Sequence, residues 1–299
     1  MPRVIDLADE ASCSLTECAE ALGEHGFDPM DEESLSHGAL WLRRLGNNAG
    51  FLGDLLLQNL ASRHREEGSD QAYGPQSIVL SSHRGDCFLR ANIWPGKDDT
   101  MLQASGNSTF LYDMAHDHNF HFLTLGYFGP GYWSDYYEYD YSQVSGFAGE
   151  PVSLIPKGRQ RLDPGKLMLY RAHHDVHRQL PADAMSVSLN IMHTDPIMGW
   201  MDQYRFDVDA GTIGGIVNSG STEAFLRIAV AMGTEEALDM AEHFAASHPS
   251  DRMRLTAFGA LASVQTDDAA RDGVWARAES SGSQLVAMEA KARRLALAD

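Results

Sequence analysis

The residues best suited to chemistry in this 299-residue chain are three histidines in two apolar stretches that read as strands. His116 and His118 flank Asp117, and His177 lies near the end of the second stretch. Residues i and i+2 of a β-strand point to the same face, so His116 and His118 would project side by side. One more histidine from a neighbouring strand would complete a facial set. Three imidazoles that leave coordination positions open suit a first-row transition metal that binds both substrate and oxygen.

Other histidines close to these compete for the ligand roles. His121 is three residues beyond His118, so on a regular strand it would face the opposite side and play a supporting or structural part. His173 and His174 fall in the turn before the second strand, whereas His177 opens that strand. We therefore favour His177 as the third ligand.

A different pattern, His193-Thr194-Asp195, offers a competing metal site. With a distal histidine such as His243 or His248 it would form a triad of two histidines and one carboxylate, as in 2-oxoglutarate oxygenases. That distal histidine would have to come from a helical segment, although such a triad needs it on a barrel strand. The three-histidine site is therefore the preferred hypothesis.

The elements that must position the histidines are short strands in the middle of the chain. Turns rich in proline, glycine and aspartate separate them, and no pattern of helical length lies between them. This organisation predicts an antiparallel β-sandwich or barrel, hence a mainly β fold. The expected strands are residues 77–81, 87–94, 120–128, 132–141, 166–170 and 185–192.

Both flanks of this segment read as helical. Apolar residues recur at helical spacing between residues 35 and 60, with a break at 46–48, and the charged run 63–74 reads as a linker. Helices are also expected at 222–232, 235–246 and 252–263 and in a final alanine-rich run from Ser283. We therefore predict three segments: helical residues 1–74, a β-barrel over 75–200 and a helical extension over 201–299.

The spacing of the candidate ligands resembles the two motifs of the cupin superfamily. The first motif of that family begins with HxH, which His116 and His118 match. The second motif has a glycine, a short strand and then a histidine, which Gly165 and His177 match. The resemblance covers the strand-rich segment alone. It implies a cupin-type antiparallel sandwich with a metal held by these three histidines.

One departure from the cupin pattern narrows the resemblance. A cupin usually has a glutamate ligand shortly after HxH, where this chain has Phe122 and Leu123. A site of three histidines without that carboxylate is similar to the site of the thiol dioxygenases, the cysteine dioxygenase group. The strand that ends at Trp94 also fits this group, but Met192 or His193 stands where the group has a tyrosine. The resemblance implies Fe(II), with Ni(II) or another divalent transition metal as the alternative.

An amino-acid substrate would need a partner for its carboxylate, and arginine pairs with carboxylates through two parallel hydrogen bonds. Arg90 is the first candidate, because thiol dioxygenases keep a carboxylate-binding arginine on the strand ahead of the metal motif and Arg90 shares its strand face with Asn92. Arg84, Arg171 and Arg178 are further candidates.

Tyrosines are concentrated just after the metal motif, between residues 127 and 141. A tyrosine can supply both a pocket wall and a hydroxyl group, although strand packing or a dimer interface explains such residues equally well. Tyr127 is the tyrosine that we assign to the site. Cys87 could recapitulate the Cys–Tyr crosslink of some thiol dioxygenases, but a buried and inert thiol is the preferred interpretation.

Composition excludes several classes of partner. The formal net charge of −19 argues against nucleic acids and anionic membranes, because both require a basic surface. No apolar run reaches the roughly 18–20 residues that cross a bilayer, and the N-terminal residues lack the apolar core of a secretory signal. Three cysteines at spacings that suggest neither disulfides nor structural zinc indicate free thiols, so we expect a cytoplasmic protein.

These observations predict a metal-dependent oxygenase. The expected substrates are O2 and a small amino-acid-like molecule, with a thiol such as L-cysteine as the leading candidate. Two alternatives stay open: another cupin enzyme, such as a non-thiol dioxygenase, a hydroxylase or an isomerase, and a sensor or binding protein without catalysis. The helical extensions suggest a specialised biosynthetic role, and the cupin resemblance implies a homodimer.

Overall fold

The computed structural model describes residues 1–62, 76–81 and 85–298. The expected linker at 63–74 and the candidate Arg84 lie outside these residues. The described chain forms two compact units. The sheet unit comprises residues 1–139 and 154–196, and the helical unit comprises residues 140–153 and those from 197 onward.

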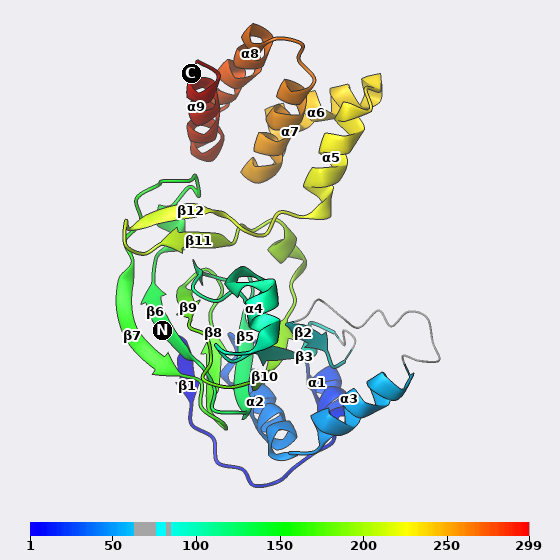
Figure 1. The fold of residues 1–299 in the computed structure, drawn as a ribbon. Coiled ribbons are helices and arrows are strands. Elements are labelled where there is room, and N and C mark those ends of the chain that lie inside the picture. The colour runs from blue at the N-terminus through cyan, green and yellow to red at the C-terminus, as the bar shows by residue number, and fades with distance from the viewer. Residues whose placement is uncertain (63–75, 82–84, 299) are drawn as a thin grey trace. The chain divides into compact units, whose positions relative to one another are not determined.

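Two antiparallel sheets build the sheet unit (Figure 1). The first sheet has the strand order β1, β8, β5, β10, β3, β2, and within this unit the second runs β4, β9, β6, β7. The predicted antiparallel β-sandwich is therefore confirmed. The strands are β1 (Arg3–Ile5), β2 (Ser77–Val79), β3 (Cys87–Trp94), β4 (Ala115–His116), β5 (Phe122–Phe128), β6 (Trp133–Glu138), β7 (Ile155–Arg161), β8 (Leu167–Tyr170), β9 (Asp175–Gln179) and β10 (Ser186–His193).

The first sheet has two buried faces, and this explains its apolar strands. On β10, Leu189 and Ile191 pack into a core shared with the N-terminal helices, whereas Met192 belongs to a separate core inside the sandwich. Successive side chains on a strand alternate between faces, so residue parity decides which side chains reach the interior. The helices on the outer face are α1 (Leu15–His25), α2 (Glu32–Asn47) and α3 (Phe51–Ser62).

Local signals fix the ends of these helices. Ser14 and Glu17 form a reciprocal capping box at the start of α1, and the Asp31 side chain accepts a hydrogen bond from the backbone N–H of Ser34 at the start of α2. The break predicted at residues 46–48 lies slightly later in the structure, because α2 continues to Asn47 and residues 48–50 separate it from α3. Because these helices share their core with the first sheet, residues 1–62 belong to the same compact unit as the strands.

Strand β7 was not expected from the sequence. Its residues, Ile155 to Arg161, are mostly polar and exposed and include Pro156 and Gly158, so the run lacks the alternation that marks a half-buried strand. Charged residues and proline are typical of edge strands, and β7 lies at the edge of its sheet.

The helical unit contains a β-hairpin followed by antiparallel helices (Figure 1). Alanines at the helix contacts, such as Ala241, Ala257 and Ala278, are almost fully buried, which allows neighbouring helices to approach closely. The helix at 268–279 was not expected, because its charged residues and glycine obscure the apolar spacing. The elements are β11 (Tyr204–Asp207), β12 (Thr212–Ile216), α5 (Ser221–Ala231), α6 (Glu235–Ser247), α7 (Asp251–Ser263), α8 (Asp268–Glu279) and α9 (Gln284–Ala298).

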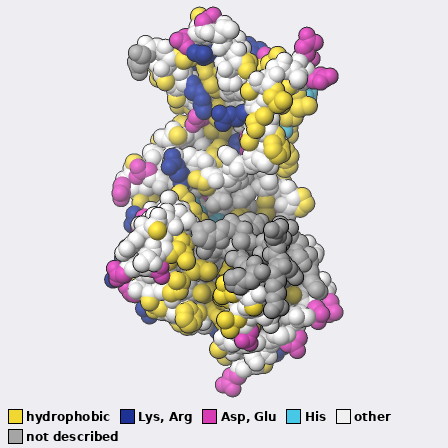
Figure 2. Space-filling model, turned by 45° about the vertical axis from the view of Figure 1, so that its right-hand side comes forward, with side chains coloured by type: hydrophobic (Ala, Val, Ile, Leu, Met, Phe, Trp, Pro, Cys, Tyr) yellow, Lys and Arg dark blue, Asp and Glu magenta, His cyan; other side chains and the backbone are white. Residues whose placement is uncertain are grey.

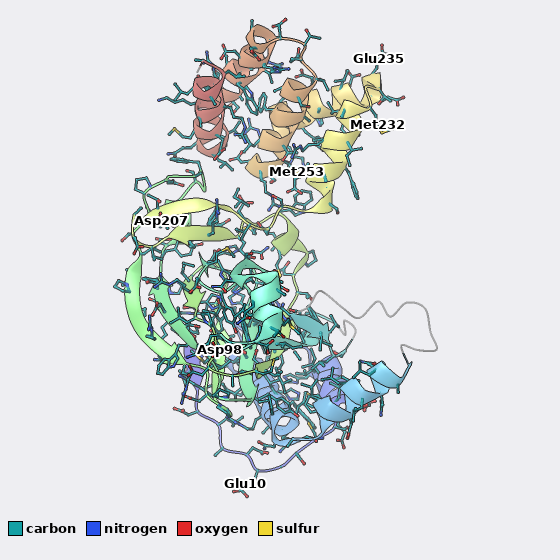
Figure 3. The ribbon with its side chains drawn as sticks, in the orientation of Figure 1. Glu10, Asp98, Asp207, Met232, Glu235 and Met253 are labelled. Carbon is teal, nitrogen blue, oxygen red and sulfur yellow. The ribbon has the colours of Figure 1, made fainter. Side chains whose placement is uncertain are left out.

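Short elements and one tight helix–helix turn also occur among the described residues. Helix α4 (Thr100–Ser105) and 3₁₀ turns at Asn107–Phe110, Tyr141–Gln143 and Pro196–Gly199 connect the larger elements. Met232 at the end of α5 and Glu235 at the start of α6 mark one helix–helix turn (Figure 3). Among the helices of the described residues, none combines the length and the apolar character needed to span a bilayer.

Replacement of Gly273 by alanine is expected to stabilise the helical unit by about 0.5–1 kcal/mol, because glycine is a poor helix former in the interior of α8. A methyl group there would meet no atom within 4 Å. The matched change Gly38→Ala in α2 is expected to destabilise the sheet unit, since its Cβ would lie 2.8 Å from the Phe27 ring. Urea denaturation measures the change in the free energy of unfolding for both variants. A change of the same sign in both would contradict this packing.

Candidate metal centre

Three histidines converge inside the sandwich from two neighbouring strands and the turn after β4. His116 on β4 pairs directly with His177 on β9 in the strand register. The ring centroid of His116 lies 4.5 Å from that of His177 and 4.9 Å from that of His118. One ring nitrogen from each histidine lies within 4.8 Å of the others, and the Nε2 atoms of His118 and His177 are 3.0 Å apart. These three are the histidines that the sequence singled out.

The protonation of His116 follows from its partner. Its Nδ1 lies 2.9 Å from the backbone oxygen of Met114, which can only accept a hydrogen bond, so Nδ1 carries the proton. The Nε2 atom then presents a lone pair, and no described residue donates a hydrogen bond to it, although the side chain is 1% exposed. A histidine that donates one ring N–H to a carbonyl and leaves its other nitrogen without a hydrogen bond, beside further imidazoles, is oriented as metal ligands are.

Burial keeps all three imidazoles neutral. Desolvation lowers the pKa of His116, and it lowers the pKa values of His118 and His177 well below their usual range. For His118, the neighbouring charges of His116, His177 and Arg90 lower the pKa further. A metal needs the neutral form of histidine, so the burial that disfavours protonation also favours binding. The donor set and its protonation fit a divalent transition metal.

The route by which His118 reaches the site differs from the expected one. Strand β4 ends at His116, so His118 lies beyond it and does not share a regular strand face. The backbone oxygen of His118 instead accepts a hydrogen bond from the backbone N–H of His173, whose φ of 57° lies in the left-handed region. The hydrogen bond from His173, in the connection between β8 and β9, therefore holds His118 in position after β4.

Asp117, between the two histidines, is part of this support. Its carboxylate is fully buried and accepts a hydrogen bond from the hydroxyl of Tyr139 at 2.5 Å. The Nδ1 atom of His173 lies 3.9 Å from the same carboxylate. Because a buried carboxylate without partners is costly, these contacts hold the 116–118 segment in one conformation.

An aromatic ring stands where a cupin would supply its carboxylate. Phe122 packs edge to face against His118, with centroids 4.9 Å apart, and stacks on Tyr170 at 4.4 Å. Leu123 lies on the opposite face of β5, in the core shared with the helices. The described centre therefore has three nitrogen donors with an apolar wall on this side.

The rival histidines have other contacts. The Nδ1 atom of His121 accepts a hydrogen bond from the backbone N–H of Ala172, and its ring faces His193. This agrees with the supporting role expected for His121. His174 is 41% exposed and lies 3.6 Å from a carboxylate oxygen of Glu138.

The competing triad is not assembled among the described residues. His193 ends β10 with its ring 6.5 Å from that of Phe27, in the layer between the first sheet and the helices. His243 and His248 both contact Phe244 within the helical unit. Neither they nor His193 belongs to a group of metal-competent side chains in the described part of the chain.

A second cluster, Glu138, His174 and Asp175, also brings potential ligands together. Desolvation raises the pKa of Glu138, but hydrogen bonds from Lys157, the amino group of Met1 and Arg171 outweigh it and bring the pKa to about 2. Ion pairs therefore already neutralise this cluster, and the three histidines are the better metal site.

The three candidate arginines among the described residues differ in where they point and in their partners. Arg90 alternates with the outward Leu89, so it points into the sandwich, and its charge acts on His118. Arg171 is paired with Glu138 and Asp175, and Arg178 is paired with Asp135. Arg90 is thus the described arginine that shares the interior with the histidines.

Tyr127 points the other way, which corrects the expectation that it lines the site. It shares its strand face with Leu125 and packs against the core of the N-terminal helices. Its hydroxyl donates to the backbone oxygens of Asn48 and Ala49, both at 3.0 Å. Tyr127 has the parity of Leu125 and the opposite parity to Phe122, but both faces of β5 are buried, so no polar side marked this orientation in the sequence.

Replacement of Tyr127 by phenylalanine is therefore expected to leave bound metal and turnover unchanged. The variant loses hydrogen bonds to the α2–α3 turn, so the free energy of unfolding of the sheet unit should fall by about 1 kcal/mol. Metal analysis and urea denaturation check both parts. A loss of turnover at full metal content would contradict this placement and indicate that Tyr127 acts at the site.

Tyr136 belongs to the tyrosine-rich stretch noted in the sequence, whereas Tyr170 and Gln179 were not expected near the histidines. The hydroxyls of Tyr136 and Tyr170 lie 2.8 Å apart, and the Tyr170 ring is 4.9 Å from that of His177. Desolvation raises the pKa of Tyr136 to about 12 and that of Tyr170 well above its usual range, so both phenols are protonated. Gln179 lies two residues after His177 on the same face, and its Nε2 is 3.3 Å from the Nε2 of His177. Spacing from His177 could have identified Gln179.

Cys87 behaves as an inert thiol. Its side chain is buried on the helix side of β3, and desolvation raises its pKa to about 12. All three cysteines are free and buried. A thiolate is the reactive form of cysteine, so this environment suppresses crosslinking chemistry.

Comparison with known proteins gives distant structural similarities. No model of a known protein family matches the chain, and no curated protein matches its sequence. A structure of hydroquinone 1,2-dioxygenase PnpCD with Cd2+ and 4-hydroxybenzonitrile is 14% identical, with a TM-score of 0.28, over 42% of this chain and 69% of that one. The DMSP lyase DddQ from Ruegeria pomeroyi is 13% identical, with a TM-score of 0.26, over 48% of this chain and 64% of that one.

A third similar structure is vicilin from Corylus avellana, hazelnut, which is 15% identical with a TM-score of 0.21 over 51% of this chain and 42% of that one. The assignment of the metal centre therefore rests on the chain's own geometry: two antiparallel sheets that enclose three converging, neutral histidines.

Proposed function

We propose that this protein is a metal-dependent oxygenase that acts on a small, polar, amino-acid-like substrate. The observation that carries the proposal is the convergence of three buried neutral imidazoles, one of which presents an Nε2 lone pair with no hydrogen-bond donor among the described residues. Three protein donors leave coordination positions for other molecules. Fe(II) is the preferred metal, and Ni(II) or another divalent transition metal is the alternative.

When bound, such an ion supplies Lewis acidity and, if redox-active, a route for reaction with O2. The residues of the chain fix the surroundings. His116 is oriented by the Met114 carbonyl, and Phe122 and Tyr170 form an apolar wall that limits water. Protein groups that hold reactants in place and exclude water contribute much of the catalysis in such sites.

Arg90 supports an anionic substrate. Its guanidinium lies on the interior face of β3, which also carries Asn92, and it is close enough to His118 to lower the pKa of that imidazole. A guanidinium there can pair with the carboxylate of an amino acid, while a thiol or amine of the same molecule approaches the metal. L-cysteine is therefore the first substrate to test.

A second candidate function, proton transfer at a metal centre without O2, is favoured by the hydrogen-bonded Tyr136–Tyr170 pair beside His177. A buried phenol can donate a proton to a reacting group or take one from it. An isomerase or a lyase would use such a pair for proton transfer, a step that the oxygenase proposed above does not assign to it.

The test uses full-length protein loaded anaerobically with Fe(II) or Ni(II) and compares wild type with His118→Ala. Oxygen uptake and product formation are followed with L-cysteine, with L-serine as the hydroxyl counterpart and with other small amino acids. The matched control is His243→Ala, an exposed histidine of α6. We expect metal-dependent O2 consumption with one of these substrates in wild type and control, and none in His118→Ala.

The arms of this experiment separate the candidates. Turnover that continues without O2 would favour the proton-transfer function. Oxygen uptake with L-serine but not L-cysteine would remove the thiol while keeping the oxygenase. Stoichiometric metal with neither turnover nor substrate binding would contradict the enzyme and favour a binding protein.

Arg90→Gln separates substrate binding from chemistry. If Arg90 pairs with the substrate carboxylate, KM should rise by about 10- to 100-fold while bound metal stays at its wild-type level, because a lost charge-assisted hydrogen bond costs about 1.5–3 kcal/mol. Substrates without a carboxylate should show no such change. An unchanged KM for a carboxylate substrate would contradict this role.

A further inference from the structure

A separate cavity lies wholly within the helical unit. Its volume is about 370 Å³, which falls in the range of sites for small molecules. Apolar side chains and cations both line it, a combination that suits a ligand with one charged and one apolar part. Those that matter here are Arg227, Arg252, Thr256, Trp275, Glu289 and Arg293.

Arg252 serves the framework of the cavity. It is 6% exposed, forms ion pairs with Glu223 at 2.8 Å and with Asp202 at 3.3 Å, and donates to the backbone oxygen of Gly199 and the side chain of Asn218. Two carboxylates therefore balance its charge. Through these contacts Arg252 connects α7 to α5 and to the segment before β11, so its side chain is held in place beside the cavity.

Arg293 and Glu289 on α9 form a second, balanced pair. Their side chains lie 2.8 Å apart, and the guanidinium of Arg293 packs over the Trp275 ring at 4.9 Å from its centroid. The carboxylate of Glu289 also accepts a hydrogen bond from the backbone N–H of Ala148. These contacts hold the Trp275 ring in place at the cavity, and the charges of Arg293 and Glu289 balance each other.

Arg227 is different from both. It is exposed on α5 and lines the cavity, and it makes no hydrogen bond or ion pair with another residue of the described chain. Figure 2 shows basic side chains gathered beside apolar ones on this unit. An unbalanced guanidinium at a preformed cavity is a ready partner for an anion, and guanidinium pairs well with carboxylate and phosphate.

We propose that this cavity binds a small organic anion. Its carboxylate or phosphate would pair with Arg227, with the hydroxyl of Thr256 as a further donor, and its apolar body would lie against Trp275 and Leu255. The site is distinct from the three-histidine centre, is built by residues of the helical unit alone and gives that unit a binding function of its own.

The test measures binding of three probes to the full-length protein by calorimetry and ligand-observed NMR. Benzoate and phenyl phosphate represent the two anion classes, and benzamide is the neutral counterpart. We compare wild type with Arg227→Gln. The matched control is Arg271→Gln, a partly exposed arginine of α8 outside the cavity whose partner Asp268 is three residues away.

Two further variants change the cavity in opposite directions. Gly259 lines it, and a Cβ there would meet only Trp275, at an ordinary 3.7 Å, so Gly259→Leu should fill the space without disturbing Arg227. Glu289→Gln removes the negative charge of the lining while keeping an oxygen for the Ala148 N–H. It should tighten binding of anions.

We expect at least one anion to bind saturably, benzamide to bind at least 10-fold more weakly, and Arg227→Gln to lose about 10-fold or more in affinity while Arg271→Gln binds as wild type does. Gly259→Leu should abolish binding, and Glu289→Gln should improve it several-fold. The anion that binds more tightly names the class. Equal affinity for benzamide, undiminished binding in Arg227→Gln, or no binding of either anion would overturn the proposal. Metal content of every variant is expected to stay unchanged, which keeps this result separate from the metal centre.

Discussion

His177→Ala is expected to weaken binding of the divalent metal by more than about 100-fold and to abolish turnover. Loss of an outer partner of a metal ligand already costs about 10- to 100-fold in affinity, so loss of a ligand should cost more. His177 pairs in register with His116, and its Nε2 atom lies 3.0 Å from that of His118, so its removal takes away a donor that adjoins both other histidines. Elemental analysis after dialysis against metal-free buffer measures the effect.

The control for this result is His243→Ala. His243 is exposed on α6 and was the distal histidine of the competing triad. It should retain full metal and unchanged stability. If His243→Ala lost the metal and His177→Ala retained it, the three-histidine centre would be wrong.

Phe27→Ala is expected to produce the largest loss of stability, about 3–5 kcal/mol in the sheet unit. The Phe27 ring is fully buried between α2 and the first sheet, beside Gly38, whose missing side chain leaves room for it. Its removal leaves a cavity between two layers, which repacking fills only in part. The loss should appear as a shift of the urea transition of this unit, followed by release of metal at lower denaturant concentration.

Met30→Ala provides the matched comparison. Met30 lies three residues from Phe27 but is 75% exposed, so its truncation should change stability by less than about 0.5 kcal/mol. If the two variants lost similar stability, the N-terminal helices would not share a core with the sheet.

The residues of the metal centre could be found from the sequence because histidine is rare in apolar strands and its chemistry is specific. His116, His118 and His177 were identified from type and spacing, and the structure brings them together. His118 reaches the site as expected, but not through a strand face shared with His116. Strand β4 ends at His116, and a backbone hydrogen bond from His173, distant in sequence, completes the geometry. Such contacts leave no signal in a local pattern.

The face of a strand was predictable only where its pattern was clear. On β3, alternation correctly set Arg90 apart from Leu89, whereas on β5 nearly every residue is buried and Tyr127 was assigned to the wrong side. A strand covered on both faces has no polar side to mark its orientation. The same ambiguity hid Tyr170 on β8, whose residues are all buried.

The division into units depends on tertiary packing. Composition changes near residue 75, which suggested a separate helical segment before the barrel. The helices α1 and α2 nevertheless bury their apolar faces on the first sheet, so one core contains both. The segment 140–153 interrupts the strand-rich region but belongs to the helical unit. No local sequence pattern indicates that a segment packs with a unit that is formed mainly by later residues.

If His116, His118 and His177 bind one divalent metal, anomalous X-ray scattering from a crystal of the metal-loaded protein should locate it between them. We predict one strong anomalous peak about 2.0–2.2 Å from a ring nitrogen of each of the three histidines. A peak at the cluster of Glu138, His174 and Asp175, or no peak at the three histidines after loading, would contradict it.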